Sequence, residues 1–191
     1  MLYNDSMDKV TETKLHFAKV FTKLREEKPV DQIRIKDLCG QGGASRQTFY
    51  YHFIDKDDFI SWMLEFELDR AYKSVVGPFN EEGLGIVLDK INSSDSFYRS
   101  MYAGDGASKD VTFLSNVIND YESRVVRSSY HLAELSKEQE FIIKYHSYAL
   151  AGMIINSFSS SNEKEKQYVA KEVLNLMPPL VKDAFVKKLE R

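Results

Sequence analysis

Apolar residues recur at intervals of three and four along most of this chain, and no segment sustains a period of two. Side chains three or four positions apart share one face of a helix, so the pattern predicts an all-α fold without a sheet. The expected helices cover residues 8–27, 33–39, 45–53, 55–76, 84–91, 97–102, 111–128, 138–158, 163–176 and 180–189.

Prolines, glycines and capping residues predict where these helices begin and end. Pro29 should end the first helix, because proline disfavours the helical conformation in the residue before it. Asp55 should cap the long helix that Gly77-Pro78 stops, and Ser136 should begin the helix over 138–158. The other expected features are a cap at Asp95, loops at Gly104-Asp105-Gly106 and 157–162, and a break at Pro178-Pro179.

Residues 33–56 hold two short helices joined by a glycine-containing turn, a pattern typical of a helix-turn-helix. Ser45 should cap the second helix, because its hydroxyl can accept a bond from a free N–H of the first turn. Phe49 and Phe53 are four residues apart and should both face inward. Polar and aromatic side chains then cover the outer faces, which suits insertion into the major groove of DNA.

A small three-helix core should support this helix-turn-helix. Phe17, Phe21 and Leu24 recur at helical spacing in the first helix and can pack against Leu38 and the two phenylalanines. We therefore expect a DNA-binding domain over residues 1–56 and a second helical domain over 57–191, with the boundary inside the long helix and no flexible linker.

The composition is that of a globular protein, with 43% hydrophobic and 29% charged residues. No apolar run approaches the roughly 18–20 residues that span a membrane, and residues 1–10 lack a signal-peptide pattern. A single cysteine, Cys39, excludes an internal disulfide and fits a reducing cytoplasm.

Charge does not decide the function. Residues 1–56 hold 10 Lys and Arg against 8 Asp and Glu, a net of +2, while the whole chain carries −3. A slightly basic end on an acidic body fits a protein that meets DNA at one end, but chance asymmetry explains it equally well.

No constellation of residues points to catalysis. The sequence lacks a phosphate-binding loop, a dinucleotide fingerprint, paired-cysteine zinc spacing and a metalloprotease motif. Cys39 sits where a small buried residue is needed, so packing explains it better than reactivity. We expect no enzyme, no metal and no cofactor.

The run Gly43-Ala44-Ser45-Arg46-Gln47-Thr48-Phe49-Tyr50-Tyr51-His52-Phe53, followed by Lys56, resembles the TetR family of transcriptional regulators. Together with Ser61-Trp62, it is similar to the subgroup that includes the activator of the dihydroxyacetone kinase operon. The resemblance covers about residues 8–60 and implies the TetR-like fold, in which a long helix joins the DNA-binding domain to a C-terminal bundle.

The resemblance also implies roles for residues. Arg46 and Gln47 fall where family members contact base edges, and their side chains match guanine and adenine. Tyr50, Tyr51, His52 and Lys56 fall where members touch phosphates, although Lys56 has the alternative of a solvated surface lysine. Ser45 and Thr48 are caps or phosphate contacts.

Two departures from the family pattern stand out. Arg34 replaces a capping threonine, so that cap is lost and the arginine is expected to reach a phosphate instead. Gly40, Gly42 and Gly43 make the turn glycine-rich, at about 1 kcal/mol per helical glycine relative to alanine. The short helix is therefore expected to fray or to order only on DNA.

The resemblance further implies a homodimer on a palindromic operator, controlled by an effector. Ala149, Ala151 and Gly152 give the 138–158 helix a small-residue face for a partner, with 163–176 beside it, although this face can equally pack within one chain. The expected effector pocket is lined by Phe97, Tyr98, Met101, Tyr102, Phe113, Tyr121, Tyr145, Tyr148 and Met153.

Ordinary core packing is the alternative for each of these aromatics, and a partner protein is the alternative to a small effector. The resulting interpretation is a sequence-specific DNA-binding regulator, expected to repress. A helical protein-interaction module is the competing hypothesis.

Overall fold

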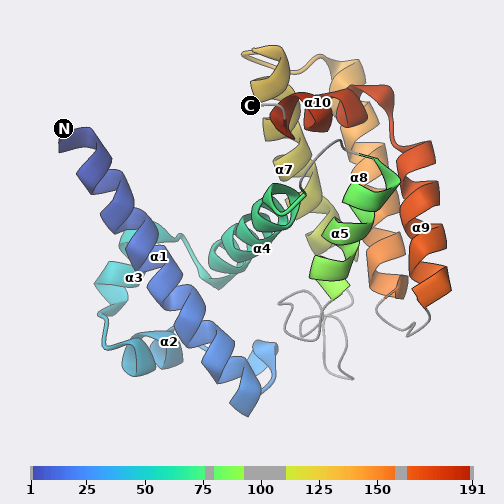
Figure 1. Ribbon diagram of the computed structural model, residues 1–191. Coiled ribbons are helices and arrows are strands. Elements are labelled where there is room, and N and C mark those ends of the chain that lie inside the picture. The colour runs from blue at the N-terminus through green and yellow to red at the C-terminus, as the bar shows by residue number, and fades with distance from the viewer. Residues whose placement is uncertain (1, 76–79, 93–110, 158–162, 190–191) are drawn as a thin grey trace. The chain divides into compact units, whose positions relative to one another are not determined.

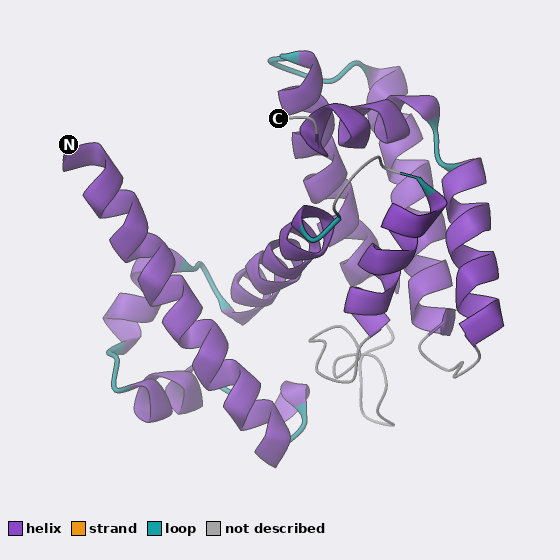
Figure 2. Ribbon diagram, in the orientation of Figure 1, coloured by secondary structure: helices purple, strands orange, loops and turns teal. Residues whose placement is uncertain are grey.

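The structure is a computed structural model of the chain that describes residues 2–75, 80–92, 111–157 and 163–189. Within these ranges every regular element is a helix, and no strand is present (Figure 2). The all-α fold is therefore confirmed. Two compact units are formed, one ending at Met63 and the other beginning at Leu64, so the division falls inside α4 (Lys56–Lys73).

The first unit contains α1 (Leu2–Glu27), the short 3-10 helix η1 (Val30–Gln32), α2 (Ile35–Gly42), α3 (Arg46–His52) and the beginning of α4. Helix α1 ends two residues before Pro29, as expected, and starts six residues earlier than the expected position 8. Helix α1 packs along α2 (Figure 1).

An aromatic cluster forms the core of this unit. The ring of Phe49 on α3 lies 5.3 Å from Phe17, 5.3 Å from Phe53 and 5.8 Å from Phe59, measured between centroids. All four side chains are buried, at a stabilisation of about 1.5–3 kcal/mol each. The inward orientation predicted for Phe49 and Phe53 is confirmed, and it fixes which face of α3 is left outside.

The second unit contains the remainder of α4, α5 (Glu81–Asn92), α7 (Val111–Tyr130), α8 (Lys137–Ser157), α9 (Glu163–Leu176) and α10 (Pro179–Leu189). Helices α7 and α8 lie side by side, α10 packs on α7, and α5 packs on α9 (Figure 1). The expected features at Gly77-Pro78, Asp95, 97–102 and 104–106 lie outside the described residues.

The side chains of Asp55 and Ser136 cap the first turns of α4 and α8, as the sequence predicts. Asp55 Oδ1 accepts a hydrogen bond from the N–H of Asp58 at 2.8 Å. Ser136 Oγ accepts from the N–H of Gln139 at 3.2 Å, and Gln139 Oε1 accepts from the N–H of Ser136 at 2.9 Å. Both pairs satisfy first-turn groups that would otherwise need water.

None of the helices in the described ranges is long and apolar enough to cross a membrane.

Candidate nucleic-acid interface

Helix α3 is held at its start by the two hydroxyls assigned to it from sequence. Ser45 Oγ accepts a hydrogen bond from the N–H of Thr48 at 3.0 Å, and the two hydroxyl oxygens lie 2.9 Å apart. The predicted Ser45 cap is confirmed, and Thr48 shares in it. Both hydroxyls therefore already have partners within the protein.

The outer face of α3 is polar and open to solvent. Arg46 and Gln47 are exposed, Tyr50 is 55% exposed and Tyr51 is 79% exposed. Because Phe49 anchors the opposite face in the core, these side chains are presented on a fixed helix. This arrangement matches the chemistry by which a reading helix meets base edges and phosphates.

The glycine-rich turn before α3 is well formed. Gly43 adopts a left-handed conformation with φ of 61° and ends α2, while the N–H of Ala44 donates to the carbonyl of Cys39 at 3.0 Å. His16 Nε2 lies 2.7 Å from the carbonyl oxygen of Gly42. Helix α2 runs from Ile35 to Gly42, and its expected fraying stays a prediction.

A carboxylate replaces the cap that Arg34 cannot supply. Asp37 Oδ2 accepts from the N–H of Arg34 at 2.9 Å and from Lys28 Nζ at 2.8 Å. The Lys28 hydrogen bond, followed by that from Arg34, holds the pKa of the Asp37 carboxyl below its usual value. The Arg34 side chain is exposed and makes no capping bond, which leaves it open to a phosphate.

Lys56 has an internal role that the sequence did not indicate. Its ammonium donates to the carbonyls of Val30 and Ile33, each at 3.0 Å, with the carbonyl of Asp31 at 3.5 Å. The alternative of a solvated surface lysine is therefore wrong. The phosphate contact stays a prediction, and it has to compete with these bonds.

His52 is half-buried at the end of α3. Burial, followed by the positive charge of Lys14, lowers the pKa of His52 below its usual value. The imidazole is consequently neutral at neutral pH, and any phosphate contact would use a ring N–H and not a full charge.

The residues predicted to line the effector pocket differ in where the structure places them. Tyr121 is buried and lines an internal cavity, whereas Phe113 does not line it. Tyr145, Tyr148 and Met153 are 70%, 40% and 42% exposed on the outside of α8, so their assignment to an internal pocket is wrong. Phe97, Tyr98, Met101 and Tyr102 lie outside the described residues.

Two features of the second unit had no sequence prediction. Glu122 and His146 form a buried pair between α7 and α8, with Glu122 Oε1 and His146 Nδ1 2.8 Å apart. Their only sequence signal is that Glu122 shares the inward face of α7 with Ile118 and Val125. Among the described side chains, no group of three or more His, Cys, Asp or Glu residues is placed to hold a metal.

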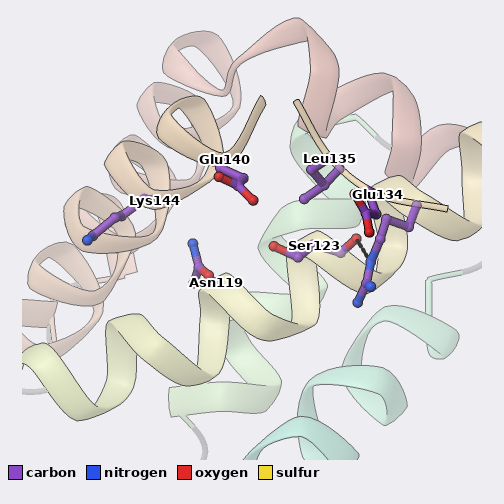
Figure 3. A pocket seen from close by; sticks show the side chains of 7 residues that line it. Asn119, Ser123, Glu134, Leu135, Glu140 and Lys144 are labelled. Carbon is purple, nitrogen blue, oxygen red and sulfur yellow. Dashed lines mark hydrogen bonds between the residues drawn. The ribbon is translucent and has the colours of Figure 1, made fainter. Parts of the chain in front are cut away.

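The other feature is an open, polar groove of about 390 Å³ between α7, α8 and the turn that joins them (Figure 3). Charged side chains of both signs line it, and within the described ranges neither Glu140 nor Lys144 forms an ion pair within 4.0 Å. The lining residues are Asn119, Ser123, Arg127, Glu134, Leu135, Glu140 and Lys144.

Comparison with known proteins identifies the class. Residues 81–179, more than half of the chain, match the TetR-type family described as "Transcriptional regulator C-terminal region". The chain belongs to the TetR family of transcriptional regulators, as residues 43–56 predicted. The predicted likeness to the subgroup of the dihydroxyacetone kinase operon activator is also confirmed.

The relative that carries this likeness is the HTH-type dhaKLM operon transcriptional activator DhaS of Lactococcus lactis subsp. lactis (strain IL1403). It is 27% identical over 186 residues, which cover 93% of this chain and 95% of DhaS. A solved structure of the dihydroxyacetone kinase operon activator DhaS aligns with 86% of this chain and 93% of its own, at 20% identity and a TM-score of 0.49.

Proposed function

We propose that this regulator binds a palindromic DNA operator as a homodimer in the cytoplasm and that an effector in its C-terminal unit controls binding. One observation carries the proposal. Helix α3 is fixed on its inner face by Phe49 and capped by Ser45, and it exposes Arg46 and Gln47 on its outer face. A rigid helix with such side chains is suited to the major groove.

The contacts divide into two kinds. Arg46 and Gln47 read base edges, since arginine can bridge O6 and N7 of guanine and glutamine can pair with adenine. Tyr50, Tyr51 and His52 contact phosphates and set the register, with Arg34 contributing from the start of α2.

An exposed apolar face on α8 supports the homodimer. Phe141 and Tyr145 are 71% and 70% exposed, one turn apart, and Tyr148 continues the same face. Apart from its own helix, none of the described residues has a heavy atom within 4 Å of a Cβ added at Gly152, so a second helix has room to approach there. Ala151, by contrast, is fully buried, so this residue packs within the chain, which is the alternative that the sequence left open for the small-residue face.

Helix α9 also exposes two large apolar side chains, Tyr168 and Leu176, which are 65% and 78% exposed. A second copy of the chain would cover these side chains and space two α3 helices about 34–36 Å apart, one turn of DNA. Exposed apolar surface of this kind is more typical of an interface than of a monomer's surface.

The direction of regulation is a separate question. The sequence predicts repression, whereas the name of the Lactococcus relative is that of an activator. A reporter gene behind the selected operator, with and without this protein, distinguishes the two: repression lowers the reporter and activation raises it.

Selection of double-stranded oligonucleotides from a random pool tests the proposal. The purified chain should enrich a palindrome whose half-sites lie about one DNA turn apart. Enrichment of no sequence, or of a single unpaired site, would contradict a dimeric reader.

A protein partner is the second candidate for the effector, and one observation favours it. The polar groove between α7 and α8 adjoins the helix that exposes Phe141 and Tyr145, so charged and aromatic groups are available on neighbouring faces. Substitution of Lys144 and Glu140 by alanine would abolish a response that depends on a partner docked there and leave DNA affinity unchanged.

A further inference from the structure

The last turn of α2 is tied to α1 by one imidazole. His16 Nε2 lies 2.7 Å from the carbonyl oxygen of Gly42, which is the last residue of α2. A carbonyl oxygen can only accept, so Nε2 carries the proton and donates it. The last carbonyls of a helix have no partner within the helix. His16 therefore supplies from α1 a hydrogen bond that α2 cannot make for itself.

Gly42 makes this close approach possible. A Cβ added at Gly42 would lie 3.1 Å from His16 Nε2 and 3.3 Å from a methyl carbon of Val20. Both distances are shorter than the roughly 3.5–4.0 Å of an optimal contact between carbon atoms. One of the glycines that depart from the family pattern thus has a structural reason, which is room for an imidazole.

The next residue of α1 holds α3 directly. Phe17 is fully buried, and its ring centroid lies 5.3 Å from that of Phe49 on α3. This packing fixes how deeply α3 sits, but apolar contacts have no preferred direction. The hydrogen bond to Gly42 is directional, and it holds the beginning of the turn over residues 43–45 that leads into α3. Two neighbouring residues of α1 thus attach both the inner face of α3 and the turn before it.

We propose that His16 is a positioning residue for DNA reading, because through Gly42 it sets the orientation in which α3 presents Arg46 and Gln47. The inference rests on the proposed reading of DNA by α3 and adds to it a residue of α1 that touches no base. Arg46 is the first residue of α3, so a shift of the turn moves it directly.

Such a shift should affect selectivity more than general affinity for DNA. Hydrogen bonds to base edges weaken steeply outside a narrow range of distance and angle. Phosphate contacts are largely electrostatic and tolerate a small displacement. Loss of the His16 bond should therefore weaken binding to the operator more than binding to other sequences.

Two amide substitutions in the full chain separate the hydrogen bond from the bulk of the side chain. The amide nitrogen of glutamine lies as many bonds from Cα as Nε2 of histidine, so His16→Gln can still donate to Gly42. The amide nitrogen of asparagine lies one bond closer to Cα and corresponds to Nδ1, so His16→Asn loses the bond. Thr11→Ala, at an exposed position of the same helix, is the control.

The readout is the affinity for the selected operator divided by the affinity for operators with one changed base pair, both from fluorescence anisotropy. This ratio does not depend on the folded fraction, so a loss of stability alone leaves it unchanged. His16→Asn should lower the ratio by about threefold to tenfold, the contribution of one hydrogen bond. His16→Gln and Thr11→Ala should stay within about twofold of the wild type, because both retain the bond.

Gly42→Ala tests the other half of the pair. The imidazole has to move away from the added Cβ, so this variant should lower the ratio as well. Combined with His16→Asn, the same substitution should change the ratio by less than about twofold, because no bond is left to lose. An effect of Gly42→Ala that is equal in both backgrounds would overturn the inference.

The bond itself can be tested without DNA. In nitrogen NMR spectra of the free chain, the neutral ring of His16 should carry its proton on Nε2. A proton on Nδ1 would overturn the inference.

The DNA measurements distinguish this inference from the proposed function. An enriched operator with equal ratios in all variants, or with a ratio that falls as far in His16→Gln as in His16→Asn, removes the inference alone. If selection enriches no sequence, the proposed function fails and the reading role of His16 fails with it.

Discussion

The ammonium of Lys56 lies 3.0 Å from the carbonyl oxygen of Ile33, so the first turn of α4 is tied to the segment that leads into α2. A second bond of the same length reaches the carbonyl of Val30. These bonds close the helix-turn-helix on itself, because α2 and α3 lie in the chain between their two ends. Lys56 therefore supports the placement of α2 and α3 from within the protein.

Substitution of Lys56 by alanine should destabilise the first unit. It removes two hydrogen bonds from a charged donor to partly buried carbonyls, and we expect a loss of about 1–2 kcal/mol in the free energy of unfolding. Denaturant unfolding measures this loss. The slope of DNA affinity against salt should be unchanged if the ammonium makes no phosphate contact.

Lys19→Ala is the matched control, since Lys19 is an exposed lysine of α1. If Lys56→Ala has wild-type stability and a flatter dependence of DNA affinity on salt, then Lys56 contacts a phosphate and does not stabilise the fold.

Gly43 at the turn and Gly40 inside α2 should respond to substitution by alanine in opposite directions. Gly43 has a φ of 61°, where a side chain is strained, so Gly43→Ala should cost about 1 kcal/mol or more. Gly40 lies inside α2, and among the described residues outside its own helix no heavy atom lies within 4 Å of an added Cβ, so Gly40→Ala should stabilise by about 0.5–1 kcal/mol. Thermal unfolding measures the stability of both variants. Equal changes in stability would contradict the observed turn.

The carboxylate at the start of α2 should make stability depend on pH. The pKa of Asp37 is lowered by Lys28 and by the Arg34 N–H, so its contribution is complete above pH 3.8 and is lost as the pH falls through the lowered value. The stability advantage of wild type over Asp37→Asn should therefore disappear in acid. Unfolding midpoints on both sides of this range measure it, with Asp31→Asn as a charge control.

An unchanged difference between wild type and Asp37→Asn across the acid range would show that the carboxylate does not stabilise the first unit through its charge.

A charge placed on the exposed face of α8 should prevent dimerisation. Tyr145→Glu buries a carboxylate in the proposed interface, which costs several kcal/mol when no cation pairs with it. Light scattering should report a monomer for this variant and a dimer for the wild type. Asn116→Glu, at an exposed position of α7, is the control and should stay dimeric.

Local signals were sufficient to predict the all-α fold and the cap and inward face of α3. The Ser45 cap depends on a contact between residues three apart, and the inward face of α3 follows from the four-residue spacing of its phenylalanines. Both features depend only on residues of one helix, so they can be predicted directly from the sequence. The same holds for the caps at Asp55 and Ser136.

Contacts between distant residues could not be obtained in this way. The partners of Lys56 are carbonyls 23 and 26 residues earlier in the chain, and carbonyls have no sequence signature. Helix α8 is apolar on both its inner and outer faces, so periodicity could not show that Tyr145 faces outward. Glu122 shares the inward face of α7, but no local signal shows that His146, 24 residues later, lies beside it.

The affinity of Arg46→Ala for the selected operator tests the central claim, that α3 reads DNA, most directly. Fluorescence anisotropy with operators changed one base pair at a time should show a loss of about 1–3 kcal/mol and a relaxed base preference at one half-site position. An Arg46→Ala variant with wild-type affinity and base preference throughout would contradict that claim.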